Sequence, residues 1–263
     1  MTYDMPPCLL VEANGPIRIV TLNRPEALNA TDEILHKAID RVWGQLAEDP
    51  DARVVVLTGA GRAFSAGGDL GLLERMSVDD DLRARVLAEA NHLVREIVRF
   101  PLPLIAAVSG PAVGLGCTLA SLSDVVIAEE QAYFADPHLT IGLVAGDGGV
   151  VSWPGLVGLQ RAKQYILTGD RISASLAYEI GLAAQVVPTG TSMAEAIGLA
   201  ERLASLPADA VQSTKRALNV HLQRAVDDVL DYALAAQHRS HGTNEHKDLL
   251  TRLSSASAPT IKV

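Results

Sequence analysis

The chain has 263 residues, of which 48% are hydrophobic and 20% charged, enough apolar material for one large domain with a buried core. Its net charge of −9 disfavours nucleic acid and anionic membranes as partners, because both are bound through clustered Lys and Arg. We find no leader peptide and no run of about 20 apolar residues that would span a bilayer, so we expect a soluble, cytoplasmic protein with reduced Cys8 and Cys117.

Short apolar runs rich in β-branched residues punctuate the first 190 residues, with helical patterns between them. The runs VVVL at 54–57 and LIAAV at 104–108 are apolar on both faces, which predicts strands that are covered on both sides. Strands that alternate with helices indicate an α/β fold. The expected strands span 17–23, 53–59, 104–110, 124–130 and 183–188.

Two long helical patterns lie in this region, and Thr31 is expected to be the N-cap of the first, over 32–49. Apolar residues at helical spacing predict the second over 79–100, which Pro101 ends. After residue 191 no strand pattern remains, and helical patterns cover 192–206, 208–222 and 225–240. We therefore expect a core over 1–190 and a helical C-terminal region over 191–263, ending in a flexible tail from Ser254.

The last of these helical patterns is rich in apolar residues. A free-standing extension would leave them in water, so they predict a face that binds other copies of the chain. The residues concerned are Val226, Val229, Leu230, Leu234, Ala235 and Ala236.

Two glycine turns carry the first functional signal. The turn at Gly110, Gly114 and Gly116 has the strand–glycine–helix order of a dinucleotide site, but its helix is only about two turns long and the turn lies mid-chain. Nucleotide binding therefore stays a minor alternative. The second turn, GAGRAFSAGGDL at 59–70, also follows a strand. Each exposes backbone N–H groups near a helix start, where two donors can hold one oxyanion, unless the glycines merely permit tight turns.

Several motifs together are similar to those of the crotonase superfamily, the enoyl-CoA hydratase/isomerase family. They run through the whole chain and include TLNRPEALNA, AFSAGGDL, PLIAAVSGPAVGLGCTLASLSDVVIA, FADPHLTIGL and RAKQYILTGDRISASLAYEIGLAAQVV. The resemblance implies a spiral of ββα turns with a helical C-terminal extension and assembly into a homotrimer or a dimer of trimers. It also implies an acyl-CoA substrate, a place in fatty acid metabolism, and no cofactor apart from the coenzyme A that the substrate carries.

By the same resemblance, an oxyanion hole forms from the backbone N–H groups of Gly68 and Leu115. Leu115 stands where the family commonly has Gly, so its side chain should reshape the acyl pocket together with Val113, Leu143 and Trp153. The family positions that line the coenzyme A channel or contact the substrate fall on Ala27, Leu28, Ala66, Asp69, Gly114 and Thr118. Lys247 and Arg252 are candidates for the coenzyme A phosphates, with solvated helix charges as the alternative.

The chain departs from the family at both positions where its hydratases carry catalytic glutamates. Those positions hold Thr118 and His138. A threonine hydroxyl does not act as a general acid or base near neutral pH, although it can hold a water molecule. Hydration by two glutamates is therefore not expected.

His138 and Asp147 are the candidate catalytic pair. Imidazole transfers protons near neutrality, and a neighbouring Asp fixes its tautomer, so we expect His138 to act as the base and Asp147 to orient it. The spacing and the following GDGGVVSWPGLVG resemble the carbon–carbon hydrolase branch that opens the diketone of oxidised camphor. The alternative is that Asp147 caps a helix and His138 is a core residue.

Three functions stay open at this stage: an enoyl-CoA hydratase or isomerase, a hydrolase of cyclic β-diketones or β-ketoacyl-CoA esters, and a non-catalytic acyl-CoA binder. The other histidines lack metal-ligand spacing, and we expect no metal site and no catalytic role for them. They are His36, His92, His221, His238, His241 and His246.

Overall fold

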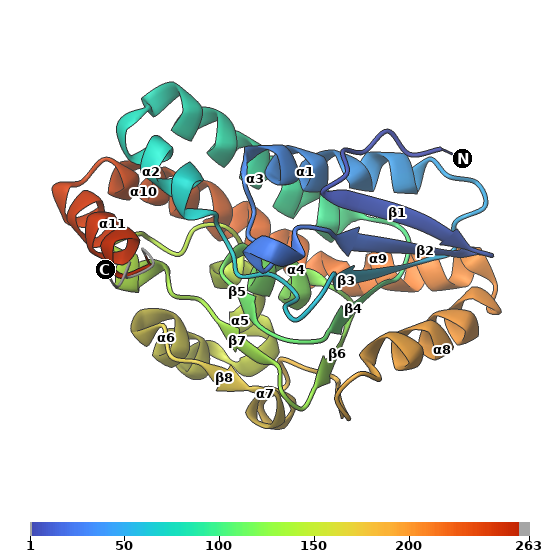
Figure 1. Ribbon diagram of the computed structural model, residues 1–263. Helices are drawn as coiled ribbons and strands as arrows, with labels where there is room; N and C mark the ends of the chain where they lie inside the picture. The colour runs from blue at the N-terminus through green and yellow to red at the C-terminus, as the bar shows by residue number, and fades with distance from the viewer. Residues whose placement is uncertain (1, 258–263) are drawn as a thin grey trace, which may run out of the picture.

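The computed structural model describes residues 2–257 and has a six-stranded sheet at its centre (Figure 1). The strand order is β1-β2-β3-β4-β6-β9, in which β1 and β2 are antiparallel and the other pairs are parallel. A smaller sheet has the order β5-β7-β8. The bounds are β1 Leu9–Asn14, β2 Ile17–Leu22, β3 Val54–Gly59, β4 Leu104–Val108, β5 Ala112–Val113, β6 Val125–Glu129, β7 Tyr133–Ala135, β8 Ile172–Ser173 and β9 Gln185–Val187.

The expected α/β class is confirmed, with strands and helices interleaved first and helices alone at the end. The helices are α1 Glu33–Ala47, α2 Leu70–Val78, α3 Asp80–Arg99, α4 Leu115–Leu122, α5 Gly149–Val157, α6 Leu159–Thr168, α7 Ala174–Ile180, α8 Ser192–Ala204, α9 Ala208–Ala225, α10 Asp231–His241 and α11 Asn244–Ser257, with a π-helical turn at Val226–Leu230. All the predicted strands are present. The prediction misses β1 and the whole smaller sheet.

The main sheet is buried on both faces, as its doubly apolar strands predict. Residues of β2, β3, β4 and β6 that point to one side pack with Ala196 and Ala200 of α8. Residues that point to the other side join a larger core with α1, α3 and α4. In β4 all five residues are buried, because each of its faces lies against helices.

The N-cap of α1 is Asp32, so the prediction of Thr31 is wrong by one residue. The Asp32 carboxylate accepts a hydrogen bond from the Leu35 backbone N–H at 2.8 Å. Thr31 instead forms a parallel bridge with Gly68. The bridge ties the start of α1 to the second glycine turn.

The C-terminal helices fold back across the molecule rather than projecting from it. In Figure 1, α9 and α10 run behind the core and α11 ends beside α2, which it contacts. Val226, Leu230 and Leu234 are buried within their own chain. These residues therefore do not form the exposed apolar face inferred from the sequence, and assembly stays a prediction on the family resemblance alone.

The predicted tail overlaps a helix, because α11 continues to Ser257 and so includes Ser254. The rest of the predicted tail, 258–263, lies outside the described residues. Cys8 and Cys117 are unpaired. Within the described part of the chain, no helix has both the length and the apolarity needed to cross a membrane.

Candidate active site

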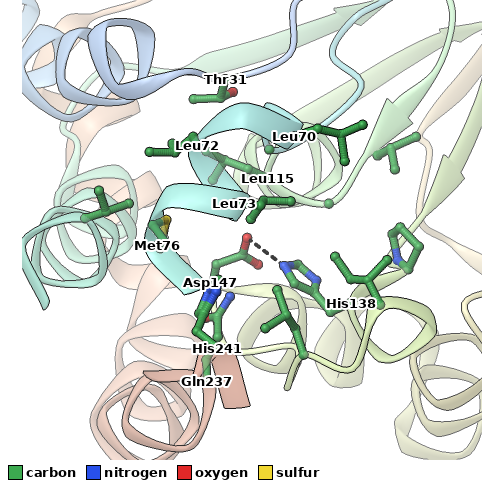
Figure 2. A pocket seen from close by; sticks show the side chains of 18 of the residues that line it. Thr31, Leu70, Leu72, Leu73, Met76, Leu115, His138, Asp147, Gln237 and His241 are labelled. Atoms are coloured by element: carbon green, nitrogen blue, oxygen red, sulfur yellow. Dashed lines mark ion pairs between the residues drawn. The ribbon is translucent and has the colours of Figure 1, made fainter. Parts of the chain in front are cut away.

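A cavity of about 330 Å³ lies where the second glycine turn, α2 and α3 meet the start of α4, the loop before α5 and helix α10 (Figure 2). Most of its wall is apolar, and α2 and α3 contribute a large share of the apolar residues. The polar groups come from the loops, from α10 and, through His36, from α1. Its lining includes Thr31, His36, Ala66, Gly67, Gly68, Leu70, Leu72, Leu73, Met76, Val86, Leu87, Ala90, Val113, Gly114, Leu115, Pro137, His138, Thr140, Ile141, Leu143, Asp147, Gln237, His241 and Leu253.

The two glycine turns meet backbone to backbone at this cavity. Gly67 has a φ of +89°, and a Cβ there would lie 2.8 Å from the Val113 carbonyl oxygen. Gly114 has a φ of +51°, and a Cβ there would lie 3.7 Å from the Gly67 Cα. Glycine is needed at 67 because both its φ and the close approach exclude a side chain.

Gly68 and Leu115, the next residue in each turn, both line the cavity. Thr31 donates its N–H to the Gly67 oxygen at 2.7 Å and accepts from the Asp69 N–H at 3.1 Å, which turns the Gly68 N–H to the opposite side. Leu115 begins α4, whose first helical bond runs from the Thr118 N–H to the Gly114 oxygen, so the Leu115 N–H has no acceptor within its helix. The two predicted oxyanion donors are therefore brought to one cavity.

His138 lies between two carboxylates beside these turns. Its Nδ1 is 2.5 Å from Asp136 Oδ1, and its Nε2 is 3.4 Å from Asp147 Oδ2. The second distance is slightly longer than a direct hydrogen bond. Thr118 Oγ1 donates to Asp147 Oδ1 at 3.2 Å. A chain of polar groups thus runs from Asp136 through the imidazole to Asp147 and Thr118.

The pKa values of this group follow from opposite charges held together in a buried place. Burial lowers the pKa of His138, but the carboxylates of Asp147 and Asp136 outweigh it and raise that pKa well above 6.5. Burial raises the pKa of Asp147, but His138 and the Thr118 hydrogen bond lower it below its usual value. At neutral pH the site therefore holds an imidazolium between carboxylates.

Asp147 is not a helix cap, so that alternative reading of the residue is wrong. The N-cap of α5 is Gly148, and no side chain caps the helix. Gly148 has a φ of +128°, and a Cβ there would lie 2.5 Å from Thr118 Cγ2. Glycine at 148 therefore lets the Asp147 loop pass close to Thr118.

The residues predicted to contact substrate divide into two groups. Ala66 and Gly114 line the cavity, and Thr118 lies behind Asp147. The other predicted residues, Ala27, Leu28 and Asp69, are not among the lining residues; Asp69 caps α2 by accepting from the Gly71 N–H at 2.9 Å. Trp153, expected to shape the pocket, is fully buried outside its lining. Lys247 and Arg252 lie on α11, and their role stays a prediction.

The site also contains polar residues that were not predicted from the sequence, among them Asp136, Gln237, His241 and His36, which lines the cavity from α1. Asp136 stands two residues before His138, and that spacing is the signal that could have identified it. Gln237 and His241 line the cavity from α10, far along the chain, and no local pattern marks them. Burial, with smaller effects from His246, His138 and Arg83, lowers the pKa of His241 to about 3.

Asp136, His138 and Asp147 also place one ligand atom each within 4.8 Å of one another, a spacing at which a metal ion fits. Both imidazole nitrogens, however, already face carboxylate oxygens, and a nitrogen must lose its proton to bind a metal. The two carboxylates therefore suit a protonated His138 at least as well as they suit a metal ion.

Comparison with known proteins places this geometry in context. A model of the enoyl-CoA hydratase/isomerase family matches residues 12–253. Short-chain-enoyl-CoA hydratase of Clostridium acetobutylicum is 34% identical over 244 residues, 92% of this chain and 93% of that protein. The 1,2-epoxyphenylacetyl-CoA isomerase of Escherichia coli is 36% identical over 225 residues, 85% and 86% respectively. A crystal structure of an enoyl-CoA hydratase/isomerase from Mycobacterium paratuberculosis has a TM-score of 0.93 and 51% identity, covering 95% of this chain and 100% of that one.

Proposed function

Because the chain belongs to the enoyl-CoA hydratase/isomerase family, we propose that it binds an acyl-CoA thioester and transfers protons along its acyl chain. The observation that carries this proposal is that one cavity holds both a pair of backbone N–H donors, at Gly68 and Leu115, and the ionised pair of His138 and Asp147. The donors would hold the thioester oxygen as it becomes an enolate oxygen. No cofactor is needed beyond the coenzyme A of the substrate.

We assign the base role to Asp147 and the acid role to His138. A carboxylate with a lowered pKa is ionised at neutral pH and can accept a proton from the carbon next to the thioester. The imidazolium then stands ready to donate, and Asp136 fixes its orientation through Nδ1. This assignment reverses the roles expected from the sequence, where His138 was the base and Asp147 its orienting partner.

Double-bond isomerisation is the family reaction that fits these groups best. It removes a proton from one carbon and donates one to another, so it needs one base and one acid, here Asp147 and His138, and no activated water. Hydration by the family's two glutamates would require carboxylates where Thr118 and His138 stand. The mostly apolar wall from α2 and α3 also favours a reaction without water.

Carbon–carbon bond hydrolysis is the second candidate, on one observation. His138 Nε2 faces the cavity beside Asp147, and a His–Asp pair can activate water for attack on a β-dicarbonyl group. That reaction needs a neutral imidazole, which the raised pKa of His138 disfavours near neutral pH.

The experiment follows trans-3-hexenoyl-CoA in D2O, with conversion to the 2-enoyl isomer and deuterium uptake at C4, the carbon that receives the donated proton, as readouts. Both should proceed in the wild type, and Asp147→Asn should stop both. Asp170→Asn, at an exposed position, is the matched control and should behave as wild type. Crotonyl-CoA and a cyclic β-diketone report hydration and ring opening in parallel.

Binding of the thioester without deuterium uptake would contradict catalysis and leave an acyl-CoA binder. Ring opening without isomerisation would favour the hydrolase. Absence of binding to every CoA ester would reject the proposal as a whole.

The family resemblance further implies a homotrimer or a dimer of trimers, which we propose for this chain. Light scattering at micromolar concentration tests it. The mass of a single chain would contradict the proposal.

A further inference from the structure

The wall of the cavity that α10 provides is polar, unlike the walls from α2 and α3. Gln237 and His241 are one turn apart on α10 and only 4% and 1% exposed, yet both line the cavity. Figure 2 shows them beside Asp147, on the side away from Leu115. A ligand whose thioester lies at Gly68 and Leu115 would therefore reach these two side chains with a more distant part of its acyl group.

Both side chains have polar atoms that the protein itself does not satisfy. Among residues 2–257, neither Gln237 Oε1 nor His241 Nδ1 has a hydrogen-bond partner, and both atoms are buried. Leaving buried polar atoms unpaired costs free energy, and most native proteins avoid it. Such a cost persists most readily where a ligand offsets it on binding.

The position of Gln237 depends on Gly146, a glycine in the loop before α5 that also carries Asp147. A Cβ at Gly146 would lie 2.7 Å from Gln237 Oε1 and 2.7 Å from the Ala233 carbonyl oxygen. The amide therefore packs directly against the backbone that precedes Asp147. The terminal torsion of a glutamine turns at little cost, so either end of this amide can face the cavity.

The chemistry of the pair suits a neutral oxygen group. An uncharged imidazole and an amide each offer a donor and an acceptor, as a hydroxyl or carbonyl oxygen requires. The low pKa of His241, about 3, keeps its ring uncharged at neutral pH, and burial is the largest cause. The cations near His241 are Arg83 and His138, and each is already paired with a carboxylate, so a ligand carboxylate would find no unpaired positive charge in these two groups.

We propose that Gln237 and His241 form an acyl-recognition subsite, and that the preferred acyl group carries a hydroxyl or carbonyl oxygen beyond its third carbon. The inference rests on the proposed acyl-CoA function and adds the class of acyl group to it. The two residues are specificity residues, because they contact the acyl group and take no part in the proton transfer.

The test compares ligands of one chain length that differ only in oxygen. Dissociation constants of hexanoyl-CoA, 4-oxohexanoyl-CoA, 5-oxohexanoyl-CoA and 5-hydroxyhexanoyl-CoA are measured by calorimetry for the wild type. At least one oxygenated ester should bind about tenfold or more tightly than hexanoyl-CoA, as one recovered hydrogen bond would give.

Two variants then locate the recognition. The quantity compared is the dissociation constant of hexanoyl-CoA divided by that of the preferred oxygenated ester. In Gln237→Met and in His241→Phe this ratio should fall to about one, with hexanoyl-CoA bound as well as by the wild type. The melting temperature of Gln237→Met should equal or exceed that of the wild type, because the replacement removes an unpaired buried atom. Gln223→Met is the matched control, since Gln223 bonds Arg99 and Asp227 away from this cavity, and its ratio should stay at the wild-type value.

Four outcomes would overturn the inference. If hexanoyl-CoA binds as tightly as every oxygenated ester, the substrate class is wrong while acyl-CoA binding stands. If the preference survives in both variants, other residues cause it. If Gln237→Met lowers the melting temperature and leaves the ratio unchanged, the amide has a structural role. His241→Phe measures the same ratio in a second variant, so the test does not depend on the folding of Gln237→Met. If no CoA ester binds, the proposed function fails and this inference with it.

Discussion

Two histidines that line one cavity, His138 and His241, have opposite pKa shifts. Carboxylates flank His138 on both ring nitrogens and raise its pKa well above 6.5 against the effect of burial. Burial lowers the pKa of His241 to about 3, and the charges of His246 and His138 add to that effect. Burial alone therefore does not determine the charge of a histidine, because the neighbouring charges decide whether its effect is reversed.

The difference divides the cavity into two parts with different uses. The part around His138 carries charge and has its polar atoms paired, which suits proton transfer. In the other part the side chains of Gln237 and His241 are uncharged and have unpaired polar atoms, which suits recognition of a neutral group. Mutations in the two parts should therefore change different measurable quantities.

The largest expected effect is on turnover. His138→Ala should lower kcat by about 10³-fold, within the range that general acid–base groups contribute, with acyl-CoA affinity changed only by a small factor. His241→Phe should lower kcat by less than about tenfold, since that ring transfers no proton. Steady-state kinetics with trans-3-hexenoyl-CoA measures both.

The combination with Asp147→Asn checks that the charged part acts as a unit. Because Asp147 is the base, the His138→Ala/Asp147→Asn double variant should be little slower than Asp147→Asn alone. Losses that multiply would show that the two residues act separately. Equal losses in His138→Ala and His241→Phe would remove the distinction between the two parts.

The next effect concerns Asp136, a second carboxylate beside His138 that has no counterpart beside His241. Asp136→Asn removes a charge from His138 Nδ1, so the pKa of His138 should fall and its orientation should loosen. We expect a loss on the order of 10²-fold in kcat. The ring signals of His138 in an NMR titration should show its midpoint nearer to 6.5 than in the wild type; an unchanged midpoint would assign the raised pKa to Asp147 alone.

The sequence identified the central strands because they are buried on both faces. β3 and β4 are continuous apolar runs, and such short runs are strong indications of a buried strand. β5 and β8 are only two residues long, too short for any period to show, and their pairing depends on chain segments far apart. The N-cap at Asp32 was missed because Thr31 is an equally good capping residue, and only the bridge to Gly68 removes it from that role.

The site was predictable as far as it is local. His138 and Asp147 lie in one glycine-rich stretch, and the structure brings both to the cavity. Asp136 lies in the same stretch, but its role depends on the orientation of the imidazole ring, which the sequence does not specify. Gln237 and His241 come from a helix whose periodicity indicates only burial, and the return of α10 to the cavity is a property of the tertiary fold.

The third effect is on stability as pH falls. His241 has a folded pKa near 3 against about 6.5 unfolded, so below pH 6.5 the unfolded state binds the proton and the native state does not. Each pH unit below 6.5 should cost about 1.4 kcal/mol, or about 2 kcal/mol at pH 5. His138 behaves oppositely: its folded pKa is raised, so its contribution is fully present below 6.5 and is lost only as pH rises through the folded value.

Urea unfolding of the wild type, His241→Phe and His138→Gln between pH 5 and 8 separates these two contributions. His241→Phe should flatten the curve below pH 6.5 and leave it unchanged above. His138→Gln should flatten it only above pH 6.5. The same slope below pH 6.5 in His241→Phe and the wild type would show that the His241 ring takes up a proton in the folded protein.

The smallest effect concerns Thr118, which donates a hydrogen bond to Asp147, the proposed base. Its hydroxyl donates to Asp147 at 3.2 Å and lowers the pKa of that carboxylate, so Thr118→Val should raise the pKa. A hydrogen bond of about 0.5–1.5 kcal/mol corresponds to an upward shift of up to about one unit in the acid limb of the kcat profile. Turnover near neutral pH should change only a few-fold, because Asp147 stays ionised there. Thr118→Ser keeps the hydroxyl and should restore the wild-type limb; if the Val and Ser variants have the same limb, the hydroxyl does not tune Asp147, and the limb belongs to another group of the cavity.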